Sequence, residues 1–338
     1  MEILGTTLFG VGRMGKIHAK NINEHPQLDL RYLVDENKEC SKTVKGKINK
    51  ITALFPNEAT IALENSDIKA CIISTPFSSH RDIVEQCLKY RKHILCEKPL
   101  TPTLKEAEEL FKIAETRGLN LMVNFQRRFD PQFREIYDLV RKGEIGNVRV
   151  IKTTSRDPPA MVSLDYLKSS PGIFFDSAIH DIDIICWLAN SKPTSIYAVG
   201  SATDELYAEQ GDVDSCCITI TFENSIIGNI EVSRNAVQGY DQRLEVFGSK
   251  GTLQSDNKRH KLVKHLNEEG ERIDPMIQDC TERYAEAYKE VLSHFVKATN
   301  GTEEIIVKPN QVLMATHLAE LCKKSLASGN KEFVTLSF

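Results

Sequence analysis

The segment Gly10-Val-Gly-Arg-Met-Gly15 constrains the fold more than any other feature of this chain, because an apolar run precedes it and a helical pattern follows it. A G-x-G-x-x-G pattern alone is a weak signal, since short glycine patterns arise by chance, so its flanking elements give it meaning. At such a junction the first glycine permits a tight turn, the second lets the backbone approach a pyrophosphate, and the third lets helix and strand pack closely. The segment therefore predicts a dinucleotide site at a helix N-terminus.

Asp35 ends a second apolar run, Leu28–Val34, and lies about 20 residues after Gly15, where a ribose-binding carboxylate is expected. A carboxylate accepts both hydroxyls of the adenosine ribose and repels a 2′-phosphate. The next residues, Glu36 and Asn37, provide no arginine to offset that repulsion. The sequence therefore predicts NAD as the cofactor and not NADP. A glycine-rich turn followed by a surface aspartate is the alternative interpretation.

Short apolar runs alternate with helical patterns over the first 124 residues. The expected strands are Ile3–Phe9, Leu28–Val34, Ala70–Ser74, His93–Cys96 and Leu121–Asn124, and the expected helices are Met14–Glu24, Arg81–Lys89 and Leu104–Thr116. This alternation is typical of a parallel sheet with helices on both faces. We expect residues 1–124 to form a doubly wound α/β domain that binds the dinucleotide.

The pattern changes after residue 124 to longer, β-rich segments. The expected strands are Val148–Ser155, Ser195–Ser201, Ser215–Phe222, Ile226–Ser233 and Arg243–Phe247, and the expected helices are Asp130–Lys142, Thr281–Ala298 and Gln311–Ser325. Short turn signals at 223–225 and 248–251 favour antiparallel pairing. We expect residues 125–338 to form an α+β domain for substrate binding and oligomerisation, with a large, mostly antiparallel open sheet. One face of that sheet would pack on helices and the other would meet a partner subunit.

Composition excludes several classes of protein. The 338 residues are 41% hydrophobic and 27% charged with a net charge of −4, which excludes disordered and fibrous chains and gives no sign of nucleic-acid binding. No apolar run reaches 18 residues, and Met1–Phe9 lacks the basic start of a signal peptide, so no membrane association is expected. Nine cysteines without a C-x-x-C pair predict reduced thiols, no metal site and a cytoplasmic location.

The segment Cys96-Glu-Lys-Pro99 lies at the end of the expected strand His93–Cys96. Ligands of open α/β sheets bind outside the carboxyl ends of the strands, so Lys98 is expected to meet a ligand. Pro99 restricts the backbone of the lysine before it. An ordinary surface lysine is the alternative interpretation.

Asp176, His180 and Asp183 lie at positions i, i+4 and i+7, which places them on one face of a helix. The apolar residues Ile182 and Ile185 would then pack on the protein, and the polar stripe would face water or a cleft. Asp176 also suits a helix N-cap. A histidine takes up a proton near neutral pH, so the pattern indicates either a catalytic carboxylate–imidazole pair or a cap with a solvated face.

Taken together, these features resemble the glucose–fructose oxidoreductase / inositol dehydrogenase (Gfo/Idh/MocA) family. The matching motifs are the Rossmann loop Gly10–Gly15, Ile73-Ser-Thr-Pro76 followed by His80, Glu97-Lys-Pro99, and Asp176-x-x-x-His180. The resemblance spans nearly the whole chain and is strongest to inositol 2-dehydrogenases. The stretches that support it are Asn124–Asp130, Thr154–Pro158, Gly211–Asp214 and Gly239–Gly248.

The resemblance implies a role for each matching residue. For the cofactor, it implies that Asp35 holds the adenosine ribose and that the pyrophosphate is lined by Gly10, Gly12, Arg13 and Met14. It also implies that Glu97 and Lys98 lie beside the nicotinamide, and that the central part of the cofactor is bordered by Ser74, Thr75, Pro76 and His80. For the chemistry, it implies a catalytic group of Lys98, Asp176 and His180, which also bind substrate, with Arg127, Asp157 and Tyr240 as weaker candidates for substrate contact.

The implied reaction is the NAD-dependent oxidation of a secondary alcohol of a cyclic polyol, with myo-inositol as the first candidate. The sequence departs from the family at Pro171-Gly172, where many relatives carry two glycines, and Ser177 and Ala178 are smaller than the residues of many inositol-specific members. Related sugar, polyol or trans-dihydrodiol dehydrogenases are therefore alternatives. A dinucleotide-sensing regulator is another, although a sensor need not keep lysine, aspartate and histidine together. A homo-oligomer, dimer or tetramer, is implied by resemblance.

Overall fold

The computed structural model describes residues 3–46, 48, 50–159 and 168–335. They form two compact units. The first unit comprises Met1–Phe129 and Glu286–Leu313, and the second comprises Asp130–Ala285 and Met314–Phe338.

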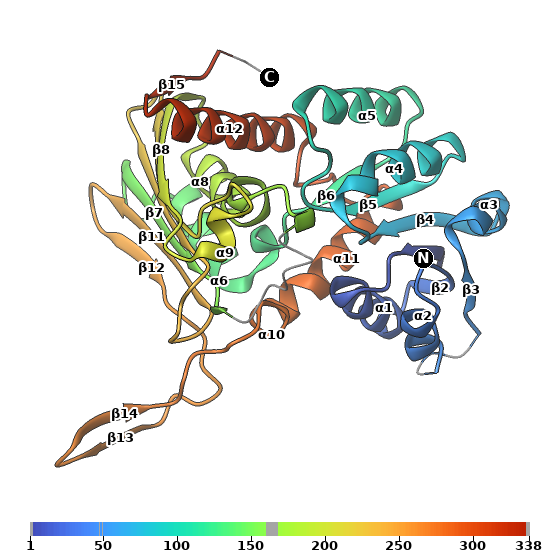
Figure 1. Ribbon diagram of the computed structural model, residues 1–338, viewed down its shortest axis with the longest axis horizontal. Coiled ribbons are helices and arrows are strands. Elements are labelled where there is room, and N and C mark those ends of the chain that lie inside the picture. Colours follow the sequence, from blue (N-terminus) through green and yellow to red (C-terminus); the bar gives the residue numbers. More distant parts are fainter. Residues whose placement is uncertain (1–2, 47, 49, 160–167, 336–338) are drawn as a thin grey trace. The chain divides into compact units, whose positions relative to one another are not determined.

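The first unit is built on a parallel sheet of six strands in the order β3-β2-β1-β4-β5-β6 (Figure 1). The strands are β1 (Leu4–Phe9), β2 (Leu28–Val34), β3 (Thr52–Leu54), β4 (Ile68–Ile73), β5 (His93–Glu97) and β6 (Leu121–Asn124). The helices of this unit are α1 (Arg13–Glu24), α2 (Lys38–Lys45), α3 (Ala59–Glu64), α4 (His80–Lys89), α5 (Leu104–Thr116) and most of α11 (Ala285–Thr299), with short 3₁₀ turns η1 (Pro56–Glu58), η2 (Phe77–Ser79) and η3 (Gln126–Phe129). This architecture confirms the expected doubly wound sheet.

The strand order of this sheet reverses between β1 and β4, because the chain adds β2 and β3 on one side of β1 and then returns to add β4 on the other. Ligands of open α/β sheets bind at such a switch point, outside the carboxyl ends of the strands. The strands are buried on both faces, with Leu8 and Ile72 fully inaccessible, which explains why they appear in the sequence as continuous apolar runs.

The unit boundary differs from the expected division after residue 124, because residues 125–129 and 286–313 pack with the first unit. Three contacts hold α11 there. The Tyr288 ring meets the His18 ring edge-on with centroids 6.0 Å apart, Lys289 pairs with Glu24 at 3.0 Å, and the Ala298 carbonyl accepts a hydrogen bond from Asn120. Contacts between segments this distant leave no local signal in the sequence.

The second unit contains a seven-stranded sheet in the order β12-β11-β7-β10-β9-β8-β15 (Figure 1). Its strands are β7 (Val148–Arg156), β8 (Pro193–Ser201), β9 (Ser215–Phe222), β10 (Ile227–Ser233), β11 (Asp241–Gly248), β12 (Thr252–Ser255) and β15 (Glu332–Phe333). The β7–β10 pair is parallel and the other described pairs of this sheet are antiparallel. The expected mostly antiparallel sheet is therefore confirmed.

The two faces of this sheet differ. Its helical elements are α6 (Pro131–Arg141), the π-helical turn η5 (Phe174–Ala178), α8 (Ile179–Ala189), α9 (Glu205–Ala208), α10 (Cys280–Arg283) and α12 (Pro309–Ser328). Helices α6, α8 and α12 lie on one side of the sheet in Figure 1, and Ile218 and Ile230 are buried on that face. The alternate side chains, such as Tyr197 and Val199, point to the other face and are 40% and 45% exposed.

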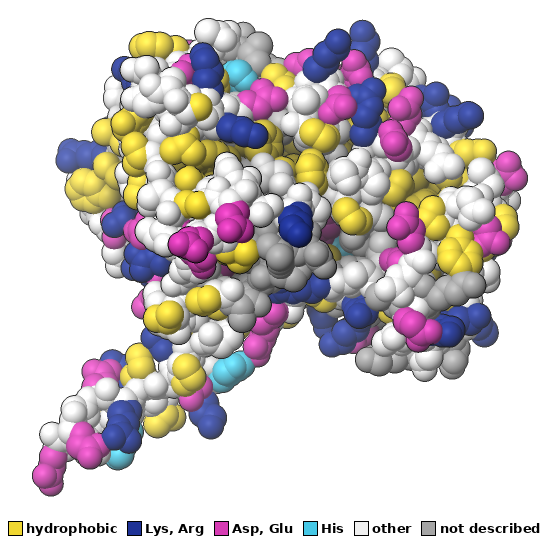
Figure 2. Space-filling model, in the orientation of Figure 1, with side chains coloured by type: hydrophobic (Ala, Val, Ile, Leu, Met, Phe, Trp, Pro, Cys, Tyr) yellow, Lys and Arg dark blue, Asp and Glu magenta, His cyan; other side chains and the backbone are white. Residues whose placement is uncertain are grey.

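A separate hairpin, β13 (Lys264–Asn267) and β14 (Gly270–Ile273), extends away from the sheet of the second unit (Figure 1). All eight of its strand residues are exposed, and charged and apolar side chains are mixed along it in Figure 2. This hairpin was not among the strands expected from the sequence.

Among the described residues, no helix is both long and apolar enough to cross a bilayer. The free thiols are Cys71, Cys87, Cys96, Cys186, Cys216, Cys217, Cys280 and Cys322.

Candidate active site

The glycine loop joins β1 to α1, and its three glycines differ in the space that surrounds them. Gly10 has a φ of +82°, and a Cβ there would lie 2.6 Å from the Thr75 backbone nitrogen. A Cβ on Gly15 would lie 2.0 Å from the Gly10 carbonyl oxygen, whereas a Cβ on Gly12 would meet nothing within 4 Å. The first and third glycines are therefore required by the packing of the chain, and the second borders open space at the start of α1. This cradle fits a dinucleotide pyrophosphate.

The Asp35 carboxylate follows β2 and is held by two backbone groups. Its Oδ2 accepts a hydrogen bond of 2.5 Å from the Val11 N–H, and its Oδ1 accepts one of 2.6 Å from the Asn37 N–H. These contacts fix the carboxylate against the glycine loop, in the place from which a ribose hydroxyl is held in dinucleotide sites.

Two side chains connect the loops after β1, β4 and β5. The Ser74 hydroxyl donates to the Gly10 carbonyl at 2.9 Å. The His80 ring lies between the Thr75 carbonyl, at 3.0 Å from Nε2, and the Pro99 carbonyl, at 2.8 Å from Nδ1. Burial lowers the pKa of His80, and a neutral imidazole carries a single N–H, so the ring donates to one of these two carbonyls and lies against the other.

Glu97 and Lys98 end β5, and the Lys98–Pro99 peptide bond is cis. The Glu97 Oε1 atom accepts hydrogen bonds from His18 Nε2 at 2.7 Å and from Asn124 Nδ2 at 2.8 Å. Burial opposes ionisation of Glu97, but these hydrogen bonds and the charges of His18 and Lys98 outweigh it and lower the pKa of the carboxyl. Glu97 is thus an ionised carboxylate enclosed by protein. His18 and Asn124 were not expected from the sequence, although Asn124 ends a strand at this same edge.

All the cofactor candidates of the first unit follow the carboxyl ends of its strands. Because parallel strands end at the same edge of a sheet, the topology gathers them at one edge. Those candidates are Gly10, Gly12, Arg13 and Met14 after β1, Asp35 after β2, Ser74, Thr75, Pro76 and His80 after β4, and Glu97 and Lys98 at β5. Arg127, a substrate candidate, lies in η3 after β6 and is buried.

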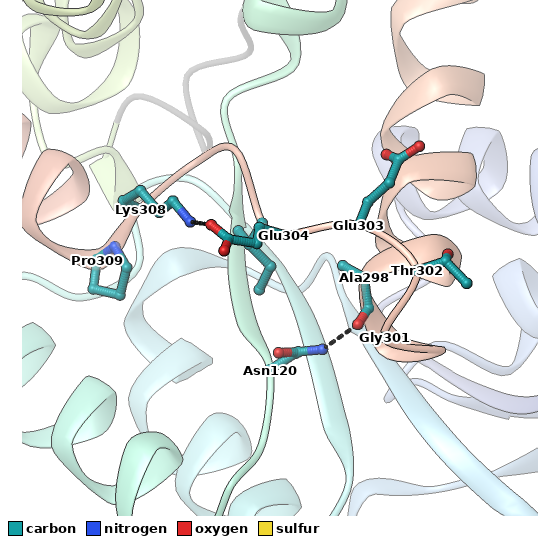
Figure 3. A pocket seen from close by; sticks show the side chains of 9 residues that line it. Asn120, Ala298, Gly301, Thr302, Glu303, Glu304, Lys308 and Pro309 are labelled. Atoms are coloured by element: carbon teal, nitrogen blue, oxygen red, sulfur yellow. Dashed lines mark hydrogen bonds and ion pairs between the residues drawn. The ribbon is translucent and has the colours of Figure 1, made fainter.

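A hollow of about 530 Å³ in the first unit lies elsewhere, between the end of α11 and the start of α12 (Figure 3). Asn120 donates to the Ala298 carbonyl at 3.0 Å and Lys308 pairs with Glu304 at 2.7 Å along its walls. Asn120 precedes β6, so this hollow lies at the amino end of the parallel strands. It is therefore on the opposite edge from the cofactor candidates.

The substrate candidates of the second unit also share an edge. In the parallel β7–β10 pair, Arg156 is in register with Ser233, and the antiparallel strands β9 and β11 begin at that same edge. The residues next to these strand ends are Asp157 after β7, Arg234 after β10, Tyr240 before β11 and Asp212 before β9. The Asp157 N–H donates to the Ser233 carbonyl at 2.7 Å, and the buried Tyr240 ring lies edge-on to Tyr284.

Asp176 lies within the π-helical turn η5, and not at the helix N-cap suggested by the sequence. Its N–H donates to the Gly172 carbonyl at 2.9 Å, so the backbone is already helical at this residue. Its Oδ2 accepts from Arg234 Nη2 at 3.3 Å. Single π turns inserted before or within α-helices occur frequently at functional sites.

His180 lies one turn later, in the first turn of α8, and is 8% exposed. Of the two interpretations of this pattern, the solvated polar face is wrong, because Asp183 is also buried, as is every residue of α8 except Cys186. Asp181, also buried, accepts a hydrogen bond of 2.8 Å from the Ser155 hydroxyl. The helix is thus an interior element of the unit.

Two family models match the chain. The oxidoreductase family with an NAD-binding Rossmann fold matches residues 4–125, and the GFO/IDH/MocA C-terminal domain matches residues 133–254. The myo-inositol 2-dehydrogenase of Thermotoga maritima is 35% identical over 94% of this chain and 95% of its own.

Two solved structures share the fold over nearly the full length. A myo-inositol dehydrogenase from Corynebacterium glutamicum matches with a TM-score of 0.92 and 32% identity over 99% of this chain and 100% of that one. The scyllo-inositol dehydrogenase from Lactobacillus casei, with bound NAD(H) and scyllo-inositol, matches with a TM-score of 0.91 and 26% identity over 99% of this chain and 100% of that one. The chain belongs to the GFO/IDH/MocA family of oxidoreductases and uses NAD as its cofactor.

Proposed function

We propose that this protein oxidises one secondary alcohol of a cyclic polyol with NAD, converting myo-inositol to 2-keto-inositol. The observation that carries the proposal is that lysine, aspartate and histidine are all retained, as Lys98, Asp176 and His180, in a chain similar along its length to an inositol 2-dehydrogenase. A dinucleotide-sensing regulator would not need that set.

In the proposed mechanism each of the three side chains has one role. His180 takes the proton of the reacting hydroxyl as general base. The Lys98 ammonium orients that hydroxyl and stabilises the developing alkoxide. Asp176 accepts a substrate hydroxyl and positions the imidazole. When bound, NAD supplies the hydride acceptor. Lys98 belongs to the first unit and the other two to the second, so their convergence on one substrate is part of the proposal.

The cofactor assignment follows the contacts of the first unit. We assign the pyrophosphate to Gly10, Gly12, Arg13 and Met14, the ribose to Asp35, and the central part to Ser74, Thr75 and Pro76. His80 and Glu97 are enclosed by protein partners, which supports a role in holding Thr75, Pro99 and Lys98 in place beside the cofactor.

Three further residues are assigned to the polyol. A polar group suited to a polyol hydroxyl is carried by each of Arg127, Asp157 and Tyr240. Two of them, Asp157 and Tyr240, lie at the same sheet edge as Arg234, which contacts Asp176. A scyllo-inositol substrate is the second candidate, supported by the likeness to the Lactobacillus casei enzyme.

A panel of cyclic polyols and sugars, each with NAD⁺ and with NADP⁺, tests the proposal through the absorbance of reduced cofactor. The expected result is that myo-inositol with NAD⁺ has the highest kcat/KM. A higher kcat/KM for scyllo-inositol would reassign the substrate. Turnover of a sugar or a trans-dihydrodiol alone would assign a sibling activity, and no turnover at all would favour the regulator.

We also propose that the protein is a homo-oligomer, formed through the open face of the second unit's sheet. Tyr197, Val199, Ile227 and Phe247 present apolar surface there. A hollow of about 560 Å³, lined in part by Val199, lies on the same face. A flat sheet face with several apolar side chains is typical of protein interfaces.

A further inference from the structure

Arg234 is a buried cation at the edge of the second unit's sheet. Its side chain is 1% exposed and contacts two carboxylates, with Nη1 at 2.7 Å from Asp212 Oδ2 and Nη2 at 3.3 Å from Asp176 Oδ2. The guanidinium carbon also lies 5.4 Å from the centre of the Tyr207 ring. Burial opposes the charge, but the two carboxylates outweigh it and raise the pKa of Arg234. The guanidinium is therefore a permanent charge inside the unit.

Asp212 extends this contact to the start of the π turn. Its Oδ1 accepts a hydrogen bond of 3.1 Å from the Ile173 N–H. Gly172, with a φ of +89°, lies against the same carboxylate, and a Cβ there would be 3.3 Å from Asp212 Oδ1. One guanidinium thus holds the turn at two points, through Asp212 at its first residues and directly at Asp176.

We propose that Arg234 is a positioning residue for the reaction. It keeps the Asp176 carboxylate ionised and fixes the π turn, so that Asp176 acts as a hydrogen-bond acceptor for the polyol and not as a proton donor. The inference rests on the proposed polyol oxidation, and it gives a role to a residue that the sequence analysis did not select.

The geometry requires arginine in particular. The planar guanidinium presents separate N–H groups to two carboxylates, whereas the single ammonium of lysine is a point charge on a flexible stem. Arg234→Lys keeps the positive charge but loses the planar pair of N–H groups that reaches both carboxylates, and Arg234→Gln loses the charge as well. We expect Arg234→Gln to lower kcat/KM for the polyol by about 10- to 100-fold, and to leave the Kd for NAD unchanged.

The pH profile separates positioning from general loss of structure. A nearby cation lowers the pKa of a carboxyl group, so its removal raises that pKa. Both the general base His180 and the acceptor Asp176 must be unprotonated, so both contribute to the acid limb of the kcat/KM profile, and removing a nearby cation raises the pKa of either group. In Arg234→Gln the acid limb is therefore expected to move to higher pH, and in Arg234→Lys it should stay closer to that of the unaltered protein.

Arg283 provides the matched control. It is also 1% exposed, in the same unit, and its Nη1 lies 2.5 Å from Asp130 Oδ2, a carboxylate outside the proposed site. Arg283→Gln should lower the melting temperature without moving the acid limb. If Arg234→Gln does not fold, Asp212→Asn replaces it and should lower kcat/KM for the polyol with the Kd for NAD unchanged.

The outcomes distinguish the two claims. An unaltered protein that oxidises no polyol overturns the proposed function, and this inference with it. An active protein whose Arg234→Gln variant keeps its acid limb, or shows the same profile as Arg283→Gln, overturns the inference alone. If Arg234→Gln does not fold, an Asp212→Asn variant with unchanged kcat/KM overturns it.

Discussion

At the scale of single residues, the charges near the candidate site are explained by their partners. Asp35 is held by two backbone N–H groups, Glu97 by two side chains, and Arg234 by two carboxylates. A buried charge is costly unless such partners compensate it. Glu97, whose pKa is lowered, and Arg234, whose pKa is raised, are therefore charged before any ligand arrives.

Asp35→Ser should weaken NAD binding and relax the discrimination against NADP. The substitution removes the carboxylate that repels a 2′-phosphate, and with it the hydrogen bond to the Val11 N–H. The ratio of kcat/KM for NAD to that for NADP measures the effect and should fall. An unchanged ratio would show that Asp35 does not contact the ribose.

Glu97→Gln should change how stability depends on pH. The pKa of Glu97 is lowered from 4.5 in the folded protein, so its ionised form stabilises the fold above that pH and the contribution is lost as the pH falls below it. Urea unfolding should show a loss of about 1–3 kcal/mol near neutral pH, shrinking as the medium becomes more acid.

Glu304→Gln is the control for this measurement, because that carboxylate is exposed and pairs with Lys308 on the surface. It should change stability little at any pH. A Glu97→Gln difference that stays constant with pH would show that folding does not lower the pKa of Glu97.

At the scale of elements, the β1–α1 junction and the η5–α8 segment carry most of the proposed chemistry. In the first, glycine permits close approach of β1, β4 and α1. In the second, a π turn places Asp176 one turn before His180, while α8 is anchored in the interior. Both segments are rigid supports for groups at an edge of a sheet.

Two glycine substitutions at the β1–α1 junction should affect different properties, NAD binding in one and stability in the other. Gly12→Ala adds a methyl group into the open space that the proposed pyrophosphate site occupies, so the fold should keep its stability. The Kd for NAD should rise about 10-fold or more, which corresponds to about 1.4 kcal/mol of binding free energy. Gly15→Ala forces a Cβ against the Gly10 carbonyl and should cost about 1–3 kcal/mol of stability. Urea unfolding and NAD titration of both variants measure this, and equal losses of stability would contradict it.

At the scale of the whole molecule, each unit gathers its candidate residues at one edge of its sheet. The first does so at the carboxyl ends of parallel strands, and the second at the shared ends of β7, β9, β10 and β11. The remaining face of the second sheet is the one that we propose for association between copies of the chain.

Val199→Asp should dissociate the proposed oligomer, because it places a charge on a side chain that is 45% exposed on the open sheet face. Ile61→Asp is the control, since Ile61 is a similarly exposed apolar residue in α3 of the first unit. Sedimentation should show smaller particles for Val199→Asp alone. Unaltered particles would place the interface elsewhere.

Local patterns were sufficient to predict most strands of both sheets and the glycine loop. Short apolar runs predicted the strands of the first unit except β3, and longer β-rich segments with turn signals predicted those of the second sheet except β12 and β15. The spacing of Asp176 and His180 predicted one helical face, but not the π turn or the complete burial of α8, which depend on the surrounding chain. The pairing of Arg234 with Asp176, and the return of 286–313 to the first unit, arise from contacts between distant segments and have no local signal.

A double-mutant cycle on Lys98 and His180 tests the central claim most directly, because it measures whether residues of different units act on the same bound polyol. With myo-inositol and NAD⁺, His180→Ala should lower kcat by about 10²- to 10⁴-fold while NAD still binds. Residues that act as a unit are strongly non-additive, so adding Lys98→Met should cost little beyond the more damaging single variant. Losses that multiply independently, or an unchanged kcat in His180→Ala, would contradict the account.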